Sequence, residues 1–323
     1  MASISSLFGY FLNFIYNLVQ NYGLAIIIFS ILLKIVLLPL SIKQHKTMKK
    51  TTKIQEKVKD IQDKYKNDPN KMNQEMMDLY KKENMSPLSG CLSSIIQIVI
   101  LLAMFGLVRN PLTYMLKINQ DTINEVANYI KIESEENKID NAYPQISILK
   151  YVSKNPDKII DLNSYNNEKI ESNEESIEES EKETNEINLK DFYINMNFIG
   201  LDLSNIPKEN WNDWTVFVIP VLYVLTSIVS MKLTTNMTKQ TQNKDIVEIK
   251  NEDNKKEEMN PEDMSEQMNK SMTWFMPIMS VSISLIAPLG LALYWLVNNI
   301  LMIIERIALN KILKPEEEDE QNG

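Results

Sequence analysis

Residues 22–42, YGLAIIIFSILLKIVLLPLSI, are long enough to cross a bilayer, yet they carry a charged residue, Lys34, near the middle. A spanning helix needs about 20 predominantly apolar residues, and a lysine at its centre costs roughly 2.5–3.5 kcal/mol on the insertion scale. The surrounding isoleucines and leucines offset that cost, so this stretch is predicted to insert. Ser30 and Ser41 share a helical face with Lys34, which makes that face polar. Lys34 either snorkels toward the headgroups or, as we predict, faces a hydrophilic site.

Three further apolar segments also carry polar stripes at helical spacing. The stripes are Ser86, Ser89, Ser93 and Gln97; Tyr223, Thr226, Ser230 and Thr234; and Trp295, Asn298, Asn299 and Met302. One such stripe alone is typical of ordinary hydrogen bonding between helices. Their recurrence in several spans favours one shared hydrophilic site.

Apolar and charged residues are segregated along the chain, which indicates a multi-span membrane protein. Lysines crowd the end of the first span, and such lysines mark the cytoplasmic side. We therefore expect the N-terminus outside and the C-terminus inside. The lysines are Lys43, Lys46, Lys49, Lys50 and Lys53.

The resulting fold class is an all-α polytopic membrane protein with five spans around a hydrophilic groove and a cytoplasmic helical hairpin. The spans are expected over residues 22–42, 87–108, 213–233, 271–287 and 289–307. An interfacial amphipathic helix is expected over 1–20, the hairpin over 43–85, an acidic, partly disordered extracytoplasmic loop over 109–212, a cytoplasmic loop over 234–270 and an acidic, disordered cytoplasmic tail over 308–323.

The hairpin prediction depends on an apolar pattern with a break in its middle. Ile54, Val58 and Ile61 follow coiled-coil spacing, and Asp68-Pro69 supplies an N-cap and a favoured first residue for a second arm. Two antiparallel arms are therefore expected to pair on the cytoplasmic side.

Composition argues against several functional classes. The formal net charge is −9 and no basic surface for nucleic acid stands out, while no phosphate-binding loop or dinucleotide motif is present. One cysteine, Cys91, leaves no intramolecular disulfide. His45 lies among lysines, where a solvated surface position is expected rather than a metal site. We therefore expect no enzymatic activity and no cofactor.

Four phrases resemble the YidC-type membrane protein insertase family, which also has mitochondrial and chloroplast members. They are NYGLAIII with LLKIVLLPL (residues 21–40), QEMMDLYKKENMSPLSGC (residues 74–91), the following SSIIQ, and APLGLALYWLVNN (residues 287–299). With the order of five spans and the hairpin, the resemblance covers residues 1–110 and 195–310.

The resemblance implies a groove, open to the cytoplasm and to lipid, that accepts the hydrophilic part of a substrate protein. The family's groove cation is usually arginine, and Lys34 stands at that position here. Nascent membrane proteins would be the partners, with membrane lipids, the Sec translocon and the ribosome, although an acidic tail weakens the ribosome inference. A monomer is the expected working state. The predicted groove residues are Lys34, Ser30, Ser93, Gln97, Thr226, Ser230, Trp295 and Asn298.

Two other functional classes remain open at this point. The same polar stripes would suit a small-solute transporter or channel with Lys34 as an anion site, although no inverted repeat is visible. A lipid-interacting scaffold without transfer activity is the third reading. Insertion assays with purified protein discriminate among the three.

Overall fold

Long helices form most of the computed structural model, which describes residues 2–83, 89–133, 139–161, 186–242 and 282–321. The longest are α1 (Ala2–Val19), α2 (Tyr22–Lys64), α4 (Ser89–Arg109), α9 (Val218–Gln242) and α11 (Leu289–Gln321). In the described part of the chain, four segments are long and apolar enough to cross a membrane, with Ile98–Arg109 as a shorter apolar helix. The predicted class, an all-α polytopic membrane protein, is confirmed. The four segments are Ala2–Val19, Tyr22–Thr47, Trp214–Leu233 and Leu289–Ile312.

The chain divides into two compact units. The first unit comprises Met1–Phe29, Leu101–Pro220 and Ser284–Tyr294, and the second comprises Ser30–Ile100, Val221–Ile283 and Trp295–Gly323. Helices α2, α4, α9 and α11 each contribute residues to both units.

In the first unit, α1 packs closely against α5 (Pro111–Tyr114) and the end of α4. The Ser5 hydroxyl donates a hydrogen bond to the Ala103 carbonyl at 2.9 Å. A Cβ atom at Gly9 would lie 2.0 Å from the Tyr114 carbonyl oxygen, so only glycine fits there. Helix α1 has no charged residues and is apolar enough to span a membrane, so its composition suits a span as well as an interfacial helix. Its interfacial placement therefore stays a prediction.

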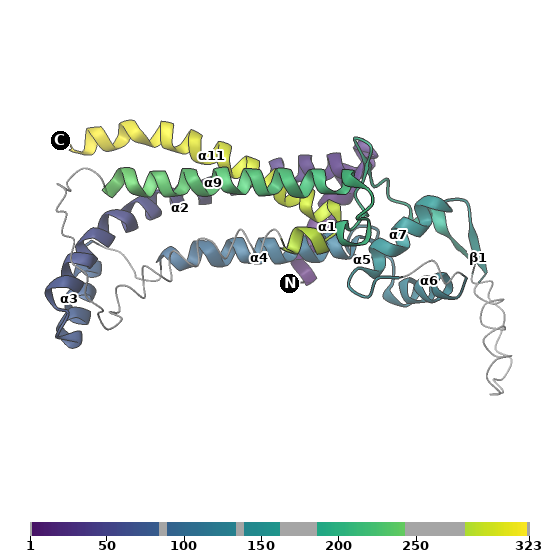
Figure 1. Cartoon of the computed structure of the whole chain (residues 1–323), viewed down its shortest axis with the longest axis horizontal. Helices are drawn as coiled ribbons and strands as arrows, with labels where there is room; N and C mark the ends of the chain where they lie inside the picture. Colours follow the sequence, from purple (N-terminus) through teal and green to yellow (C-terminus); the bar gives the residue numbers. More distant parts are fainter. Residues whose placement is uncertain (1, 84–88, 134–138, 162–185, 243–281, 322–323) are drawn as a thin grey trace. The chain divides into compact units, whose positions relative to one another are not determined.

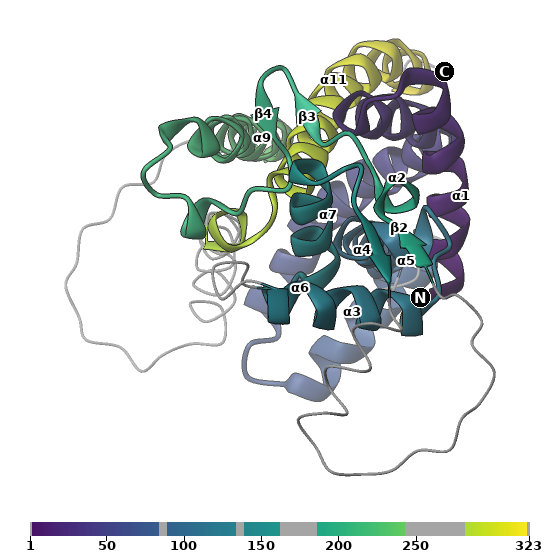
Figure 2. The same cartoon turned by 90° about the vertical axis from the view of Figure 1, so that its right-hand side faces the viewer.

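A small helical module in the first unit was not predicted from the sequence. Helix α6 (Gln120–Glu133) packs on α7 (Pro144–Lys154), and strand β1 (Ile159–Asp161) pairs with β2 (Glu186–Asn188) before the 3-10 helix η1 (Leu189–Phe192), as Figures 1 and 2 show. Its fully buried side chains make an apolar core of their own. They include Ile123, Val126, Ile130, Ile148, Leu149, Val152 and Leu189.

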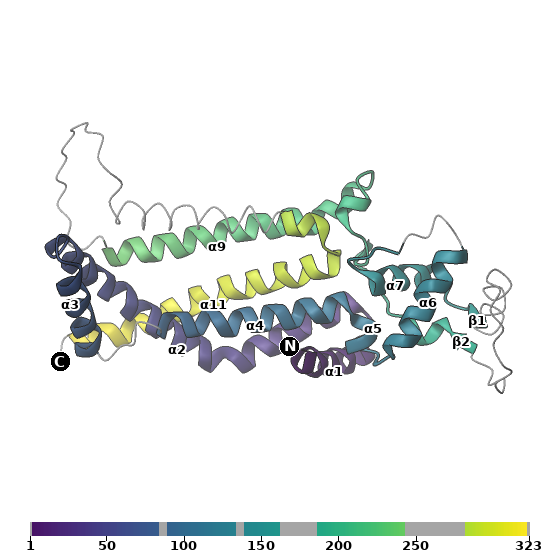
Figure 3. The ribbon, with the colours of Figure 1, turned by 90° about the horizontal axis from the view of Figure 1, so that it is seen from below.

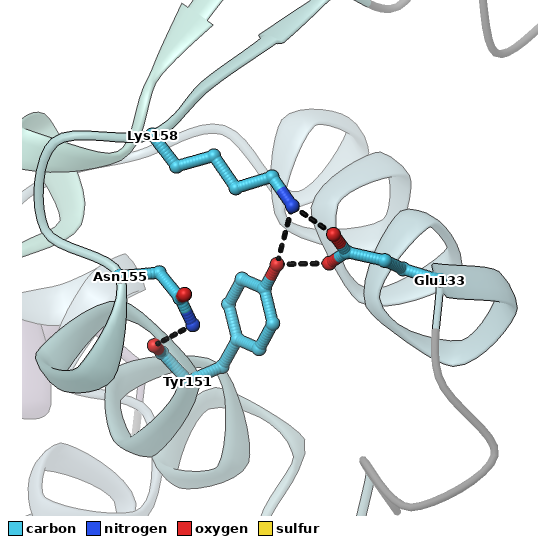
Figure 4. Close-up of polar contacts among 4 residues, drawn as sticks. All are labelled: Glu133, Tyr151, Asn155 and Lys158. Carbon is cyan, nitrogen blue, oxygen red and sulfur yellow. Dashed lines mark hydrogen bonds and ion pairs between the residues drawn. The ribbon is translucent and has the colours of Figure 1, made fainter.

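A polar network joins the end of α6 to α7 and to the residues before β1 (Figure 4). Lys158 and the Tyr151 hydroxyl both donate to the Glu133 carboxylate, and the Lys158 ammonium lies 3.1 Å from the Tyr151 hydroxyl. Asn155 donates from its side chain to the Tyr151 carbonyl at 3.1 Å. Every member has a partner, so we interpret this network as a tie within the module.

A second pair of antiparallel strands and several short 3-10 turns connect this module to α9. Strands β3 (Asn197–Phe198) and β4 (Leu201–Asp202) form a hairpin, followed by η2 (Pro207–Glu209) and η3 (Trp214–Phe217). The Tyr22 amide at the start of α2 donates to the Asn195 carbonyl at 3.0 Å, which fixes the chain entering α2 beside this hairpin.

The second unit contains a helical hairpin. Helix α2 continues unbroken through Lys64, and α3 (Pro69–Lys82) returns beside its end (Figure 3). The predicted start of the second arm is confirmed, because the Asp68 carboxylate accepts a hydrogen bond from the Lys71 amide and Pro69 is the first helical residue. An ion pair of 2.6 Å between Lys57 and Glu83 closes the open end of the hairpin.

Two sequence-based expectations need correction, and one lies largely outside the described residues. His45 is buried rather than solvated, with 5% of its surface exposed. Helix α11 continues through Gln321, so the acidic tail begins as helix rather than as a disordered segment. Of the predicted fourth span, residues 271–281 fall outside the part that the structure describes, which resumes with a helical turn at 282.

Candidate polar site in the membrane-spanning helices

Polar side chains of three spanning helices make two sets of contacts along α11 in the second unit, an ion pair with α2 and hydrogen bonds with α9. We call them the polar cluster, and they are Lys34 of α2, Thr226 and Ser227 of α9, and Asn299 and Glu305 of α11. The parts of α9 and α11 in this unit run alongside each other (Figure 1). The cluster therefore links all three helices through polar contacts.

The charged members of the polar cluster form an ion pair. The Lys34 ammonium lies 2.6 Å from a carboxylate oxygen of Glu305, and the two side chains are 21% and 11% exposed. A single buried charge in an apolar medium is costly, whereas a close pair with opposite sign recovers much of the desolvation cost. Pairing therefore makes a charged α2 compatible with a span. The second Glu305 oxygen, Oε1, is buried and has no hydrogen-bond partner among the described residues.

The uncharged members join α9 to α11 by hydrogen bonds. The Asn299 amide donates to the Ser227 hydroxyl at 2.7 Å and to the Thr226 hydroxyl at 3.4 Å. Thr226 in turn donates to the Tyr223 carbonyl one turn earlier, at 2.9 Å. Such bonds between spanning helices are worth about 0.6 kcal/mol on average, so they orient the helices more than they stabilise them.

Aromatic and basic side chains flank the polar cluster. The rings of Tyr223 and Trp295 lie 5.8 Å apart in a tilted arrangement, and the Trp295 indole N–H is buried without a partner in the described part of the chain. Arg306, next to Glu305, donates to the Ser230 carbonyl at 3.5 Å. The site thus has donors on α9 and α11 and a charge pair between α2 and α11.

The same helices also expose many apolar side chains. This pattern suits contact with hydrocarbon, because in lipid the polar groups of a span must be turned toward protein or a hydrated cavity. The exposed residues include Ile31, Leu32, Ile35 and Val36 of α2, Val221, Leu225, Ile228 and Val229 of α9, and Ile300, Ile304 and Ile307 of α11.

Most of the sequence-predicted groove residues fall in the second unit. Lys34 and Thr226 belong to the polar cluster, Ser30 and Ser230 are buried, and Asn298 is half-buried. Trp295 stacks beside Tyr223, as described above. Ser93 and Gln97 lie on α4, but the structure does not describe their side chains.

Sequence reasoning missed Glu305 and Ser227 as members of the cluster, and it placed Asn299 in a polar stripe without choosing it as a groove residue. Glu305 could have been found by the argument applied to Lys34, since it is an ionisable residue inside a predicted span. Asn299 is the neighbour of the predicted Asn298, and the two side chains point about 100° apart on a helix. The described residues contain no group of three or more His, Cys, Asp or Glu side chains that could hold a metal ion.

Comparison with known proteins gives consistent results. The sequence profile of a family described as 60Kd inner membrane protein matches residues 14–317. The membrane protein insertase YidC of Treponema denticola is 24% identical over 314 residues, which are 97% of this chain and 38% of that protein. The proteins of the same name from Fusobacterium nucleatum and Caldanaerobacter subterraneus are 43% and 41% identical, each over 34% of this chain. The matched parts are 38%, 56% and 53% of the lengths of these three relatives.

Proposed function

This chain belongs to the 60Kd inner membrane protein family, and we propose that it is a membrane protein insertase. In this proposal a hydrophilic segment of a substrate protein enters a polar groove at Lys34, while the apolar segment passes into lipid. One observation carries it: a buried charge pair and a hydrogen-bonded polar cluster lie on helices that also expose many apolar side chains.

The energetics of this mechanism need no nucleotide. Transfer of a substrate's apolar segment into hydrocarbon releases about 25 cal/mol per Å² of apolar surface, and this release supplies the driving force. The obstacle is the polar segment that must cross some 30 Å of hydrocarbon. A hydrated groove through part of that thickness shortens the barrier, and the Lys34 ammonium attracts acidic residues.

The proposed groove walls follow from position in the second unit. Ser30, Thr226, Ser230, Trp295 and Asn298 are the wall residues on α2, α9 and α11. Ser93 and Gln97 are proposed to complete the wall from α4. Hydroxyl, amide and indole groups at these positions would replace water around a polar peptide segment.

The surroundings of the proposed insertase follow from the same reasoning. We propose an N-terminus outside and a C-terminus in the cytoplasm, which places the hairpin of α2 and α3 where nascent chains emerge. Nascent membrane proteins are the proposed substrates, taken up by a monomer alone or beside the Sec translocon and the ribosome. The curated relatives carry the name membrane protein insertase, which supports the assignment.

The test is insertion of a single-span protein with an acidic outer segment into proteoliposomes that contain the purified chain. Lys34→Arg is expected to insert at the wild-type level, Lys34→Gln to be impaired and Lys34→Glu to be the most impaired. Lys43→Gln, at an exposed lysine of the same helix, is the matched control and should behave as wild type. Equal insertion by all Lys34 variants would refute the role of the charge. Wild-type insertion no better than in protein-free vesicles would refute the activity.

A further inference from the structure

We propose that Glu305 determines which substrate segments the site accepts, because it makes the buried charge at Lys34 one half of a neutral pair. This inference rests on the insertase function proposed above. It adds a selectivity-determining residue, and it changes the ligand that the site prefers from an acidic segment to one that carries both acidic and basic or donor groups.

The first step is the charge balance at Lys34. With Glu305 at 2.6 Å and both side chains mostly buried, the Lys34–Glu305 pair has no net charge. An acidic residue of a substrate that approaches Lys34 meets the repulsion of the Glu305 carboxylate as well as the attraction of the ammonium. At the effective dielectric constant of about 20 that suits partly buried sites, two charges 4 Å apart interact with a magnitude large enough to change binding more than tenfold.

The second step is the unused hydrogen-bonding capacity of the pair. Glu305 uses Oε2 to bind Lys34, while its buried Oε1 has no partner among the described residues. A buried carboxylate oxygen without a donor is costly, and such a group is satisfied by a ligand donor. A lysine or arginine of the substrate, a hydroxyl or a backbone N–H would supply that donor.

The third step is a comparison with a matched pair elsewhere in the same unit. Lys57 and Glu83 are also 2.6 Å apart, but their side chains are 57% and 33% exposed. Water screens that pair, so its loss changes little beyond the hairpin. Lys34 and Glu305 are more buried than this pair, so water screens their charges less. Removing one of them should therefore change which substrate charges the site attracts.

The experiment compares two model substrates that are identical except for their outer segment, which carries either two aspartates or two lysines. Insertion of each into proteoliposomes is measured for the wild type, Glu305→Gln, Lys34→Gln and the charge exchange Lys34→Glu with Glu305→Lys. Glu83→Gln is the control for loss of a paired carboxylate in the hairpin. The measured quantity is the ratio of acidic to basic substrate inserted.

We expect the wild type to prefer the acidic substrate only modestly, because the Lys34–Glu305 pair is neutral and the neighbouring Arg306 adds one positive charge. Glu305→Gln should raise the acidic-to-basic ratio roughly tenfold and Lys34→Gln should lower it by a similar factor, because each removes one charge of the pair. The charge exchange and Glu83→Gln should keep the wild-type ratio. If Glu305→Gln fails to fold, Lys34→Gln and the charge exchange still test the ratio.

Two outcomes separate this inference from the proposed function. If the wild type inserts substrate but Glu305→Gln lowers both substrates equally, or leaves the ratio unchanged, Glu305 is only a structural tie and the inference is overturned. If the wild type inserts neither substrate above protein-free vesicles, the proposed function fails and the selectivity role fails with it.

Discussion

Gly9 marks a close approach between two backbones in the first unit. The space that a side chain would need is occupied by the Tyr114 carbonyl group and Cβ atom of α5. Backbone atoms cannot move aside as the end of a flexible side chain can. A methyl group at this position must therefore separate α1 from α5.

The Gly9→Ala protein is expected to unfold more readily than the wild type in detergent, by about 1–3 kcal/mol, since overpacking a close contact costs that much. Leu7→Ala, at an exposed position of the same helix, is the control and should have little effect. Thermal unfolding followed by tryptophan fluorescence measures both. Equal unfolding temperatures for Gly9→Ala and the wild type would show that α1 moves freely against α5.

At the residue scale, the sequence identifies ionisable groups inside spans but not their partners. Lys34 is recognisable from its apolar neighbours alone, and the same rule applies to Glu305. Their pairing depends on the relative depth of α2 and α11, which no local pattern contains. The choice between Asn298 and Asn299 depends on a helix rotation of about 100°, which a stripe read over a few residues does not resolve.

The hairpin of α2 and α3 is an element whose ends are held by one ion pair. Glu83 caps the end of α3 and accepts a hydrogen bond from Lys57, which together with the Lys57 charge holds the pKa of the Glu83 carboxyl below its ordinary value. A carboxyl with a lowered folded-state pKa stabilises the fold above its unfolded pKa. That contribution disappears as the pH falls through the folded pKa.

We therefore expect the pKa of the Glu83 carboxyl in the intact protein to lie below the ordinary glutamate value. Carboxyl-carbon NMR chemical shifts, with Glu83→Gln to assign the resonance, measure this directly. In the Lys57→Gln protein the titration should return toward the ordinary value. A Glu83 midpoint at or above that value in the wild type would contradict the ion pair.

The sequence predicted the hairpin of α2 and α3 but not the module of α6 and α7. The hairpin has a cap and a proline at its second arm, which are local signals with a clear physical meaning. Helices α6 and α7 lie in a stretch rich in Asn, Glu, Ser and Lys, whose average composition indicated disorder. Their buried residues recur at helical spacing, as Ile123, Val126 and Ile130 do, so periodicity contained the signal that composition hid.

At the scale of the whole molecule, the proposed membrane orientation rests on the lysines beside the first span, and a labelling experiment tests it directly. In a Cys91→Ser background, a Ser153→Cys protein should react with a membrane-impermeant maleimide on intact cells, because Ser153 is exposed at the end of α7. Asn70→Cys, exposed at the start of α3, should react only after permeabilisation. The reverse pattern would invert the proposed topology.

The class of the whole molecule was predictable because segregation of apolar residues survives any rearrangement of the helices. The number of spans was harder to predict, since α1 satisfies the length and composition of a span and was assigned to the interface. Length and hydropathy do not distinguish a helix that crosses a bilayer from one that lies along its surface. Packing of α1 on α4 and α5 is information that exists only in three dimensions.

The continuity of α2 connects the helical hairpin directly to the ion pair at Lys34. From Ser30 to Lys64 the helix belongs to one unit, so the hairpin and Lys34 lie on the same continuous helix. Pro39 lies between the two ends and removes one backbone hydrogen bond. We therefore expect α2 to bend at this residue. We therefore expect that a partner bound at the hairpin would change the position of Lys34 relative to Glu305 through α2.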